Sequence, residues 1–289
     1  MKKILFAAFA AAVLAGCYKV DIYWSTHPET GKITLITDWS KRSPEAAIPE
    51  SYDIMLLEPE AVWKVSETRF EIPNLFKPGS YTLHVFNEAE NLKLNGSVVS
   101  LQQIYPEPMT AKTRGPEEEW PEEEIPHEEY WFYAVPDFFF WGSVTQKIEA
   151  DRDYEVTVPM RQITRQVEID FTIEGADPQL YEEFYVYIIG TNDAWDCEAN
   201  KPVGYSMNTA IPASPQSGRR ITGETRILGV MEDRPIKMMV EFLYDDGDDF
   251  YWLTSEEIDV TADFKDFNTS DRTVPLVLKK TISFPPMIK

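Results

Sequence analysis

Short runs of alternating apolar and polar residues recur along most of the chain. The clearest run in the first half is 81–87, where Tyr81, Leu83 and Val85 are expected on one face of a strand. Thr82, His84 and Phe86 then face the other way. In the second half the same alternation runs from Arg165 through Val167, Ile169, Phe171 and Ile173. A period of two predicts strands with one buried face.

Further runs rich in β-branched and aromatic residues predict strands at short, regular spacing. They lie at 33–39, 52–57, 69–72, 97–104, 154–160, 184–189, 238–244, 250–254 and 274–278, with one more inside 219–230. Turn signals separate them: Pro78-Gly79 in the first half, and Asp245–Asp249, with its central glycine, as a hairpin tip in the second. Asp177-Pro178 predicts an N-cap and a helical turn over 179–183.

This pattern predicts an all-β protein made of two tandem β-sandwich domains that meet near Met160. The length of 289 residues agrees, because a typical domain has roughly 100–150 residues. The first domain is expected over 17–160 and the second over 161–289.

The segment 105–130 interrupts the first domain with five prolines and a run of glutamates. Proline stiffness and charge repulsion favour an extended insertion there. The plain interpretation is a solvated surface loop, and the functional one is an acidic arm for a basic partner or Ca²⁺.

The start of the chain has the layout of a bacterial secretory signal peptide. Lys2-Lys3 precede an apolar run over 4–14, which is too short to span a bilayer, since that needs about 20 residues. Ala15-Gly16-Cys17 follow, and this ending resembles the lipobox of bacterial lipoproteins. The resemblance implies a signal peptide over 1–16, cleavage between Gly16 and Cys17, and acylation of Cys17. More than one acyl chain would make the attachment lasting.

Charge narrows the possible partners. The formal net charge is −22, with 49 acidic against 27 basic residues. Nucleic-acid binding needs clustered Lys and Arg, so a DNA- or RNA-binding role is excluded. With Cys17 acylated, Cys197 has no partner for an intramolecular disulfide, and its acidic neighbours favour an inert thiol.

Catalytic motifs are missing from the sequence, and we expect neither an enzyme nor a cofactor. The three histidines, His27, His84 and His127, lack metal-ligand spacing, and His84 is expected to be structural. No metal site is expected, although four aspartates carry oxygen atoms suited to Ca²⁺. These weak candidates are Asp245, Asp246, Asp248 and Asp249.

An aromatic cluster leaves two interpretations open. These aromatic residues are Trp131, Phe138–Phe140 and Trp141, and they either belong to the sandwich core or form a surface for sugar stacking or protein binding. Exposed rings at Trp131, Trp141 and Trp252 would favour a glycan-binding surface lipoprotein, and burial would remove that alternative. A hydrolase using two carboxylates is a third class that the sequence leaves open.

Several short motifs follow one another along the chain. The lipobox leads to His27–Lys32 and a strand ending in Asp38-Trp39-Ser40. Next come the strand from Pro78 to Asn87, Pro136-Asp137 with the aromatic cluster and Gly142, and the junction 160–165. This order of motifs resembles the fimbrillin-associated anchor lipoproteins of Bacteroidetes. The likeness covers nearly the whole chain after the signal peptide.

The resemblance implies two transthyretin-like β-sandwich domains on an outer-membrane lipid anchor, exposed at the cell surface. It also implies assembly with a fimbrial subunit protein through strand donation, as an anchor or accessory subunit. Polymerising relatives lose their first strand to an Arg/Lys-specific protease, and Lys41-Arg42 follows the first strand here. A cut there would discard the lipid, so we expect Arg42 not to be a processing site.

Overall fold

The computed structural model describes residues 29–102, 135–181, 183–245 and 250–284. In these ranges the protein is all-β, as predicted, with a single 3₁₀ turn, η4 (Pro178–Leu180). The first half contains β1 (Ile33–Asp38), β2 (Tyr52–Leu56), β3 (Ala61–Val65), β4 (Arg69–Glu71), β5 (Gly79–Phe86), β6 (Leu92–Asn95), β7 (Val98–Leu101), β8 (Phe140–Ile148), β9 (Tyr154–Pro159) and β10 (Arg161–Gln162). The second half contains β11 (Arg165–Glu174), β12 (Glu183–Asp196), β13 (Lys201–Gln216), β14 (Arg220–Ile227), β15 (Lys237–Asp245), β16 (Phe250–Thr254), β17 (Ile258–Asp259) and β18 (Leu276–Ser283).

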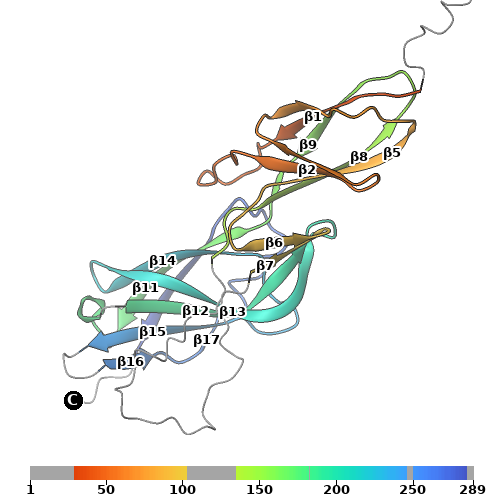
Figure 1. Cartoon of the computed structure of the whole chain (residues 1–289). Coiled ribbons are helices and arrows are strands. Elements are labelled where there is room, and N and C mark those ends of the chain that lie inside the picture. The colour runs from red at the N-terminus through yellow and green to blue at the C-terminus, as the bar shows by residue number, and fades with distance from the viewer. Residues whose placement is uncertain (1–28, 103–134, 182, 246–249, 285–289) are drawn as a thin grey trace, which may run out of the picture.

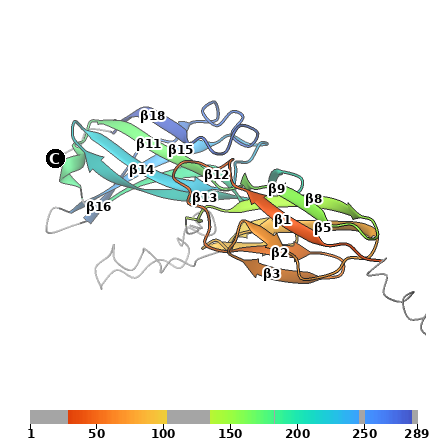
Figure 2. The same ribbon diagram turned by 90° about the horizontal axis from the view of Figure 1, so that it is seen from above.

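Two sheets form most of the first half. One has the order β4-β1-β9, and the other has the order β10-β8-β5-β2-β3. Their facing sides share one apolar cluster, to which β2 contributes Tyr52, Ile54 and Leu56, the face predicted from alternation. The two sheets lie against each other as layers (Figure 2).

A ten-stranded arrangement forms the second half, with the path β16-β15-β12-β13-β14-β11-β18. In β11 the four residues predicted to be buried, Val167, Ile169, Phe171 and Ile173, are all in the core. Apolar residues of β12 and β15 complete the same cluster, so this sheet folds back on itself around a core of its own.

Some elements differ from the sequence-based expectation. The pattern did not predict β3, β6, β8, β10, β13 or β17. In β13, prolines, a glycine and serines weaken the strand signal, and long pairing with β12 overrides that local preference. Two register shifts, after Ile189 and after Asn192, let β12 run seven residues past its predicted end. The helical turn begins at Pro178 as Asp177 caps it, and it ends at Leu180 instead of Glu183.

The two halves lie end to end, and both views show the chain entering β1 at the end of the first half far from the second (Figures 1 and 2). They are not independent. The hairpin β6–β7 belongs to the first half in sequence, but β7 pairs with the end of β12. Among the described residues no helix is long and apolar enough to cross a bilayer.

Candidate functional site: the junction and the strand edges

A third apolar cluster fills the junction between the halves. It combines Leu92, Val99 and Leu101 of the β6–β7 hairpin with residues from both sides of Met160. The others are Phe139, Trp141, Ile163, Trp195, Cys197, Met207 and Leu228. Because Trp141 and Trp195 are fully buried, this junction is packed like a domain interior.

Backbone pairing extends across the same junction. Val98, Val99 and Ser100 of β7 lie opposite the last three residues of β12. The Cys197 amide N–H donates to the Ser97 carbonyl at 2.8 Å, and the Ser97 hydroxyl donates to Asp196 at 3.2 Å. The hairpin therefore adds a strand to the sheet of the second half.

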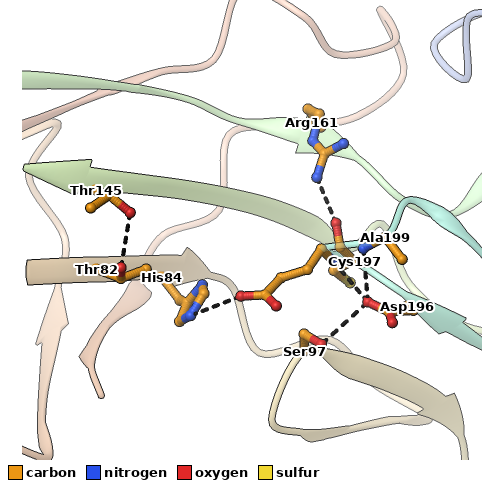
Figure 3. Close-up of polar contacts among 9 residues, drawn as sticks. Thr82, His84, Ser97, Thr145, Arg161, Asp196, Cys197 and Ala199 are labelled. Atoms are coloured by element: carbon orange, nitrogen blue, oxygen red, sulfur yellow. Dashed lines mark hydrogen bonds and ion pairs between the residues drawn. The ribbon is translucent and has the colours of Figure 1, made fainter. Parts of the chain in front are cut away.

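His84 lies at this junction, on the outer face of β5 (Figure 3). Its ring is 2% exposed, packs 4.8 Å from the Trp141 ring, and its Nε2 lies 3.3 Å from Glu198 Oε1. Burial lowers the pKa of His84, and Glu198 opposes that shift. The imidazole is therefore held mostly neutral, which agrees with the structural role predicted from its mid-strand position.

Cys197 directly precedes Glu198, the residue that pairs with His84. It is fully buried in the turn that joins β12 to β13. Its carbonyl accepts a hydrogen bond from Arg161 at 2.6 Å (Figure 3). Burial raises the pKa of the Cys197 thiol to about 12, so it stays protonated and unreactive in the folded chain.

Arg272 crosses the centre of the junction. Its guanidinium lies 4.0 Å from the Trp195 ring centroid and donates to the Ile163 and Leu228 carbonyls. Burial lowers the pKa of Arg272 to about 9. The Arg272 guanidinium is therefore held by two carbonyl oxygens and by the face of the Trp195 ring.

Gln162 links the junction to the loop after β1. Its Oε1 accepts the Ser43 amide N–H at 2.9 Å, and its Nε2 donates to the Thr164 and Arg272 carbonyls. Ser43 is only 1% exposed, whereas Arg42 next to it is exposed. The Arg42 guanidinium turns back onto the same loop, donating to the Trp39 and Ala46 carbonyls. The Arg42–Ser43 bond is therefore held in a folded loop at both of its residues.

Several described strands pair on one side only and end a sheet. In the first half β3 ends the five-stranded sheet, and in the second half β18 ends the long sheet. β3 carries Val62, which is 56% exposed, while its Lys64 pairs with Glu88. β18 carries two lysines, a common protection of edge strands. β3 is therefore the less protected of these two edges.

The aromatic cluster belongs mainly to the core. Phe139, Phe140 and Trp141 are buried, and Phe138 is half-buried against Arg226. This removes Trp141 as a sugar platform. Trp131 and the side chain of Trp252 lie outside the described residues.

Other predicted site residues also fall outside that part of the chain. They are Gly16, Cys17, His27, His127, the insertion 105–130, Asp246, Asp248, Asp249 and the side chain of Asp245. Within the ranges that are described, no group of three His, Cys, Asp or Glu residues could hold a metal ion.

The sequence did not single out Gln162, Arg272 or Glu198. In all three cases the contacts join segments more than a hundred residues apart. The only available signal was the segment 160–165, which the family resemblance places at the domain junction and which contains Gln162.

Comparison with known families places the chain near one group. Residues 1–17 match the prokaryotic membrane lipoprotein lipid attachment site. Residues 126–254 match the fimbrillin-A associated anchor proteins Mfa1 and Mfa2. No curated protein sequence matches the chain.

Solved structures share the fold at low sequence identity. A candidate adhesin from Bacteroides ovatus ATCC 8483 aligns with a TM-score of 0.59 and 14% identity, covering 91% of both chains. A second candidate adhesin from Bacteroides ovatus gives a TM-score of 0.52 and 10% identity, covering 87% of this chain and 88% of that one. The fimbrial anchor protein Mfa2 from Porphyromonas gingivalis gives a TM-score of 0.50 and 11% identity, covering 88% of this chain and 90% of that one.

These likenesses to solved structures concern the fold alone. The aligned segment of the family match contains the aromatic cluster and the strands from β8 to β16. The resemblance to the fimbrillin-associated anchor lipoproteins that the short motifs suggested is therefore confirmed, by the family match over residues 126–254 and by the shared fold.

Proposed function

We propose that this chain is a non-enzymatic, lipid-anchored outer-membrane protein that serves as a fimbrial anchor or accessory subunit. The observation that carries the proposal is the match of residues 126–254 to the fimbrillin-A associated anchor proteins. The lipid attachment match over 1–17 supports a membrane anchor ahead of the first strand.

The lipid would be attached at Cys17 after cleavage following Gly16. Acyl chains bind membranes with about 0.8 kcal/mol per buried CH₂ group, and two or more chains are needed for stable attachment. The expected location is the outer membrane, with the protein exposed at the cell surface.

We further propose that the chain divides into domains at 17–160 and 161–289. The separate apolar clusters of the two halves support this division. The β6–β7 hairpin crosses it, because β7 pairs with β12. The domains would therefore act as one unit through the junction cluster.

An anchor has to keep its lipid, so the first strand has to stay attached. The geometry around Arg42 supports this: Ser43 is buried and its amide is bonded to Gln162, while the Arg42 side chain binds its own loop. A protease needs an extended segment, which this loop does not offer. Mature chains that begin at Ser43 would contradict the proposal.

Partner recognition would use an open sheet edge. An added strand binds through main-chain hydrogen bonds, with alternate side chains giving specificity. We propose the β3 edge, since Val62 is exposed there and the single lysine of the strand is engaged by Glu88. The partner would be a fimbrial subunit protein with a donor strand.

The first test is photo-crosslinking in intact cells with a photoreactive residue at Val62. The matched control places it at Val277, an exposed valine on the other edge strand, β18. Recovery of fimbrial subunits from the β3 position alone supports the proposed edge. Recovery from β18 alone moves the edge, and recovery of the protein without fimbrial subunits from either position contradicts the anchor role.

Membrane attachment is tested separately by Cys17→Ser. The variant should move from the membrane fraction to the soluble periplasmic fraction, with an unchanged far-UV circular dichroism spectrum. Persistence in the membrane fraction would show that the lipid does not hold the protein there.

A glycan-binding surface lipoprotein remains the second candidate from the sequence. The structure weakens it at Trp141, whose ring is buried. Co-purification with polysaccharide-uptake components in the same cross-linking experiment would favour it.

A further inference from the structure

We infer that β1 and β9 form a mechanical clamp that bears tension between the membrane anchor and the second half. The inference rests on the proposed function, because a pull on the N-terminal side of β1 arises when Cys17 is fixed in a membrane. It adds load transmission to that function.

The direction of the two strands sets how they would be loaded. β1 and β9 are parallel, with Ile33 opposite Tyr154 and Asp38 opposite Pro159. The anchor pulls β1 from its N-terminal end. The second half pulls β9 from its C-terminal end, because the chain continues from Pro159 through β10 into β11. These forces act along the strands in opposite directions and load the ladder in shear.

The orientation of β10 agrees with this path. Its residues Arg161 and Gln162 lie opposite Trp141 and Phe140 of β8, so the chain keeps running away from the membrane end. The connection between the halves is therefore short and supported, and it passes the load directly to β9.

Hydrogen bonds hold β1 on both sides. At the ends of the parallel ladder, the Tyr154 amide donates to the Lys32 carbonyl at 2.8 Å and the Met160 amide donates to the Asp38 carbonyl at 2.9 Å. On the side of β1 that faces β4, the Ile72 amide N–H donates to the Ile33 carbonyl at 2.9 Å. Inter-strand bonds lie across the strand direction. Withdrawing β1 along its axis therefore requires bonds on both of its sides to break together.

Burial adds a second resistance to sliding. Ile33 and Leu35 of β1 and Val158 of β9 are 0% exposed. A slip of one residue would turn these side chains away from the core. Gly31, just before β1, has no room for a side chain, because a Cβ would lie 2.2 Å from the Arg152 carbonyl oxygen. The entry to β1 is thus packed against the turn before β9.

The second half repeats the arrangement. β11 and β18 are parallel, with Val167 opposite Leu276 and Glu174 opposite Ser283. A load applied beyond Ser283 would again meet a parallel ladder in shear. The two parallel pairs therefore lie in series along the chain.

The test is single-molecule force spectroscopy on the purified mature chain carrying Cys17→Ser. In one variant, Glu29→Cys and a cysteine added after Lys289 serve as handles, and β1 and β9 are sheared. In the other, Glu29→Cys and Arg152→Cys place both handles at the same end of the pair, so that the ladder is unzipped. Buried Cys197 does not compete for the handles in the folded chain.

The first half is expected to open at a several-fold higher force in the shear geometry than in the unzipping geometry. The length of chain released identifies which half opens. Matching thermal midpoints of the two variants show that the handles leave the fold intact. Equal opening forces, or a lower force in shear, would overturn the clamp. Since the measurement uses isolated protein, that result would leave the anchor proposal to be decided by fractionation of Cys17→Ser.

Discussion

The Gln162–Ser43 contact predicts how strongly the fold protects the Arg42–Ser43 bond. Gln162→Ala removes the acceptor of the Ser43 amide N–H, which donates to Gln162 Oε1 at 2.9 Å. Ser43 is only 1% exposed. Leaving a buried donor unsatisfied costs about 1–3 kcal/mol. Since 1.4 kcal/mol changes an equilibrium about tenfold, the loop should open roughly 5- to 150-fold more often.

The assay is limited proteolysis with an arginine-specific protease under native conditions, followed by N-terminal sequencing. When loop opening is fast relative to cleavage, the cleavage rate follows the population of the open loop. The rate of appearance of chains starting at Ser43 should therefore rise by the same factor. Cleavage after Arg219, an exposed residue in the β13–β14 turn, provides the internal standard.

A matched glutamine variant tests whether the effect is specific to the junction. Gln179→Ala removes an exposed side chain that contacts the Gln216 carbonyl, far from the junction. Its cleavage after Arg42 should equal that of the wild type. If Gln162→Ala is cut at the wild-type rate while remaining folded, the contact does not protect the bond. Rapid cleavage of the wild type at Arg42 would refute the reasoning altogether.

Three further predictions concern the junction and the core. Because burial lowers the pKa of His84 below its ordinary value, acid favours states in which the ring is exposed, and stability should fall as the pH drops through about 6.5 and below. His84→Gln should reduce the difference between thermal midpoints at pH 7.5 and pH 5.5, and an unchanged difference would assign the acid sensitivity to other groups. Gly142→Ala should destabilise the chain by about 1–3 kcal/mol in urea unfolding, because a Cβ would lie 2.5 Å from Val158 Cγ1 and 2.8 Å from Met160 Sδ; a neutral result would mean that these side chains move aside. The Cys197 thiol, with its pKa raised to about 12, should resist iodoacetamide in the native protein and react after unfolding, whereas fast native labelling would contradict its burial.

The sequence alone determined the elements whose signal is local. Strict alternation in β11 predicted the buried face Val167, Ile169, Phe171 and Ile173, since side chains of a strand alternate between its two faces. The lipid attachment motif is likewise a short contiguous pattern. Signals of this kind need no knowledge of what packs against them.

Tertiary structure decided the elements with weak local preference and every contact across the junction. β13 forms from proline- and serine-containing sequence because β12 pairs with it over most of its length. Pairing of β7 with β12 and the Gln162–Ser43 bond join segments about a hundred residues apart. Hydrogen bonds and burial between distant segments depend on the three-dimensional path of the chain. The alternation of apolar and polar residues along the sequence does not determine that path.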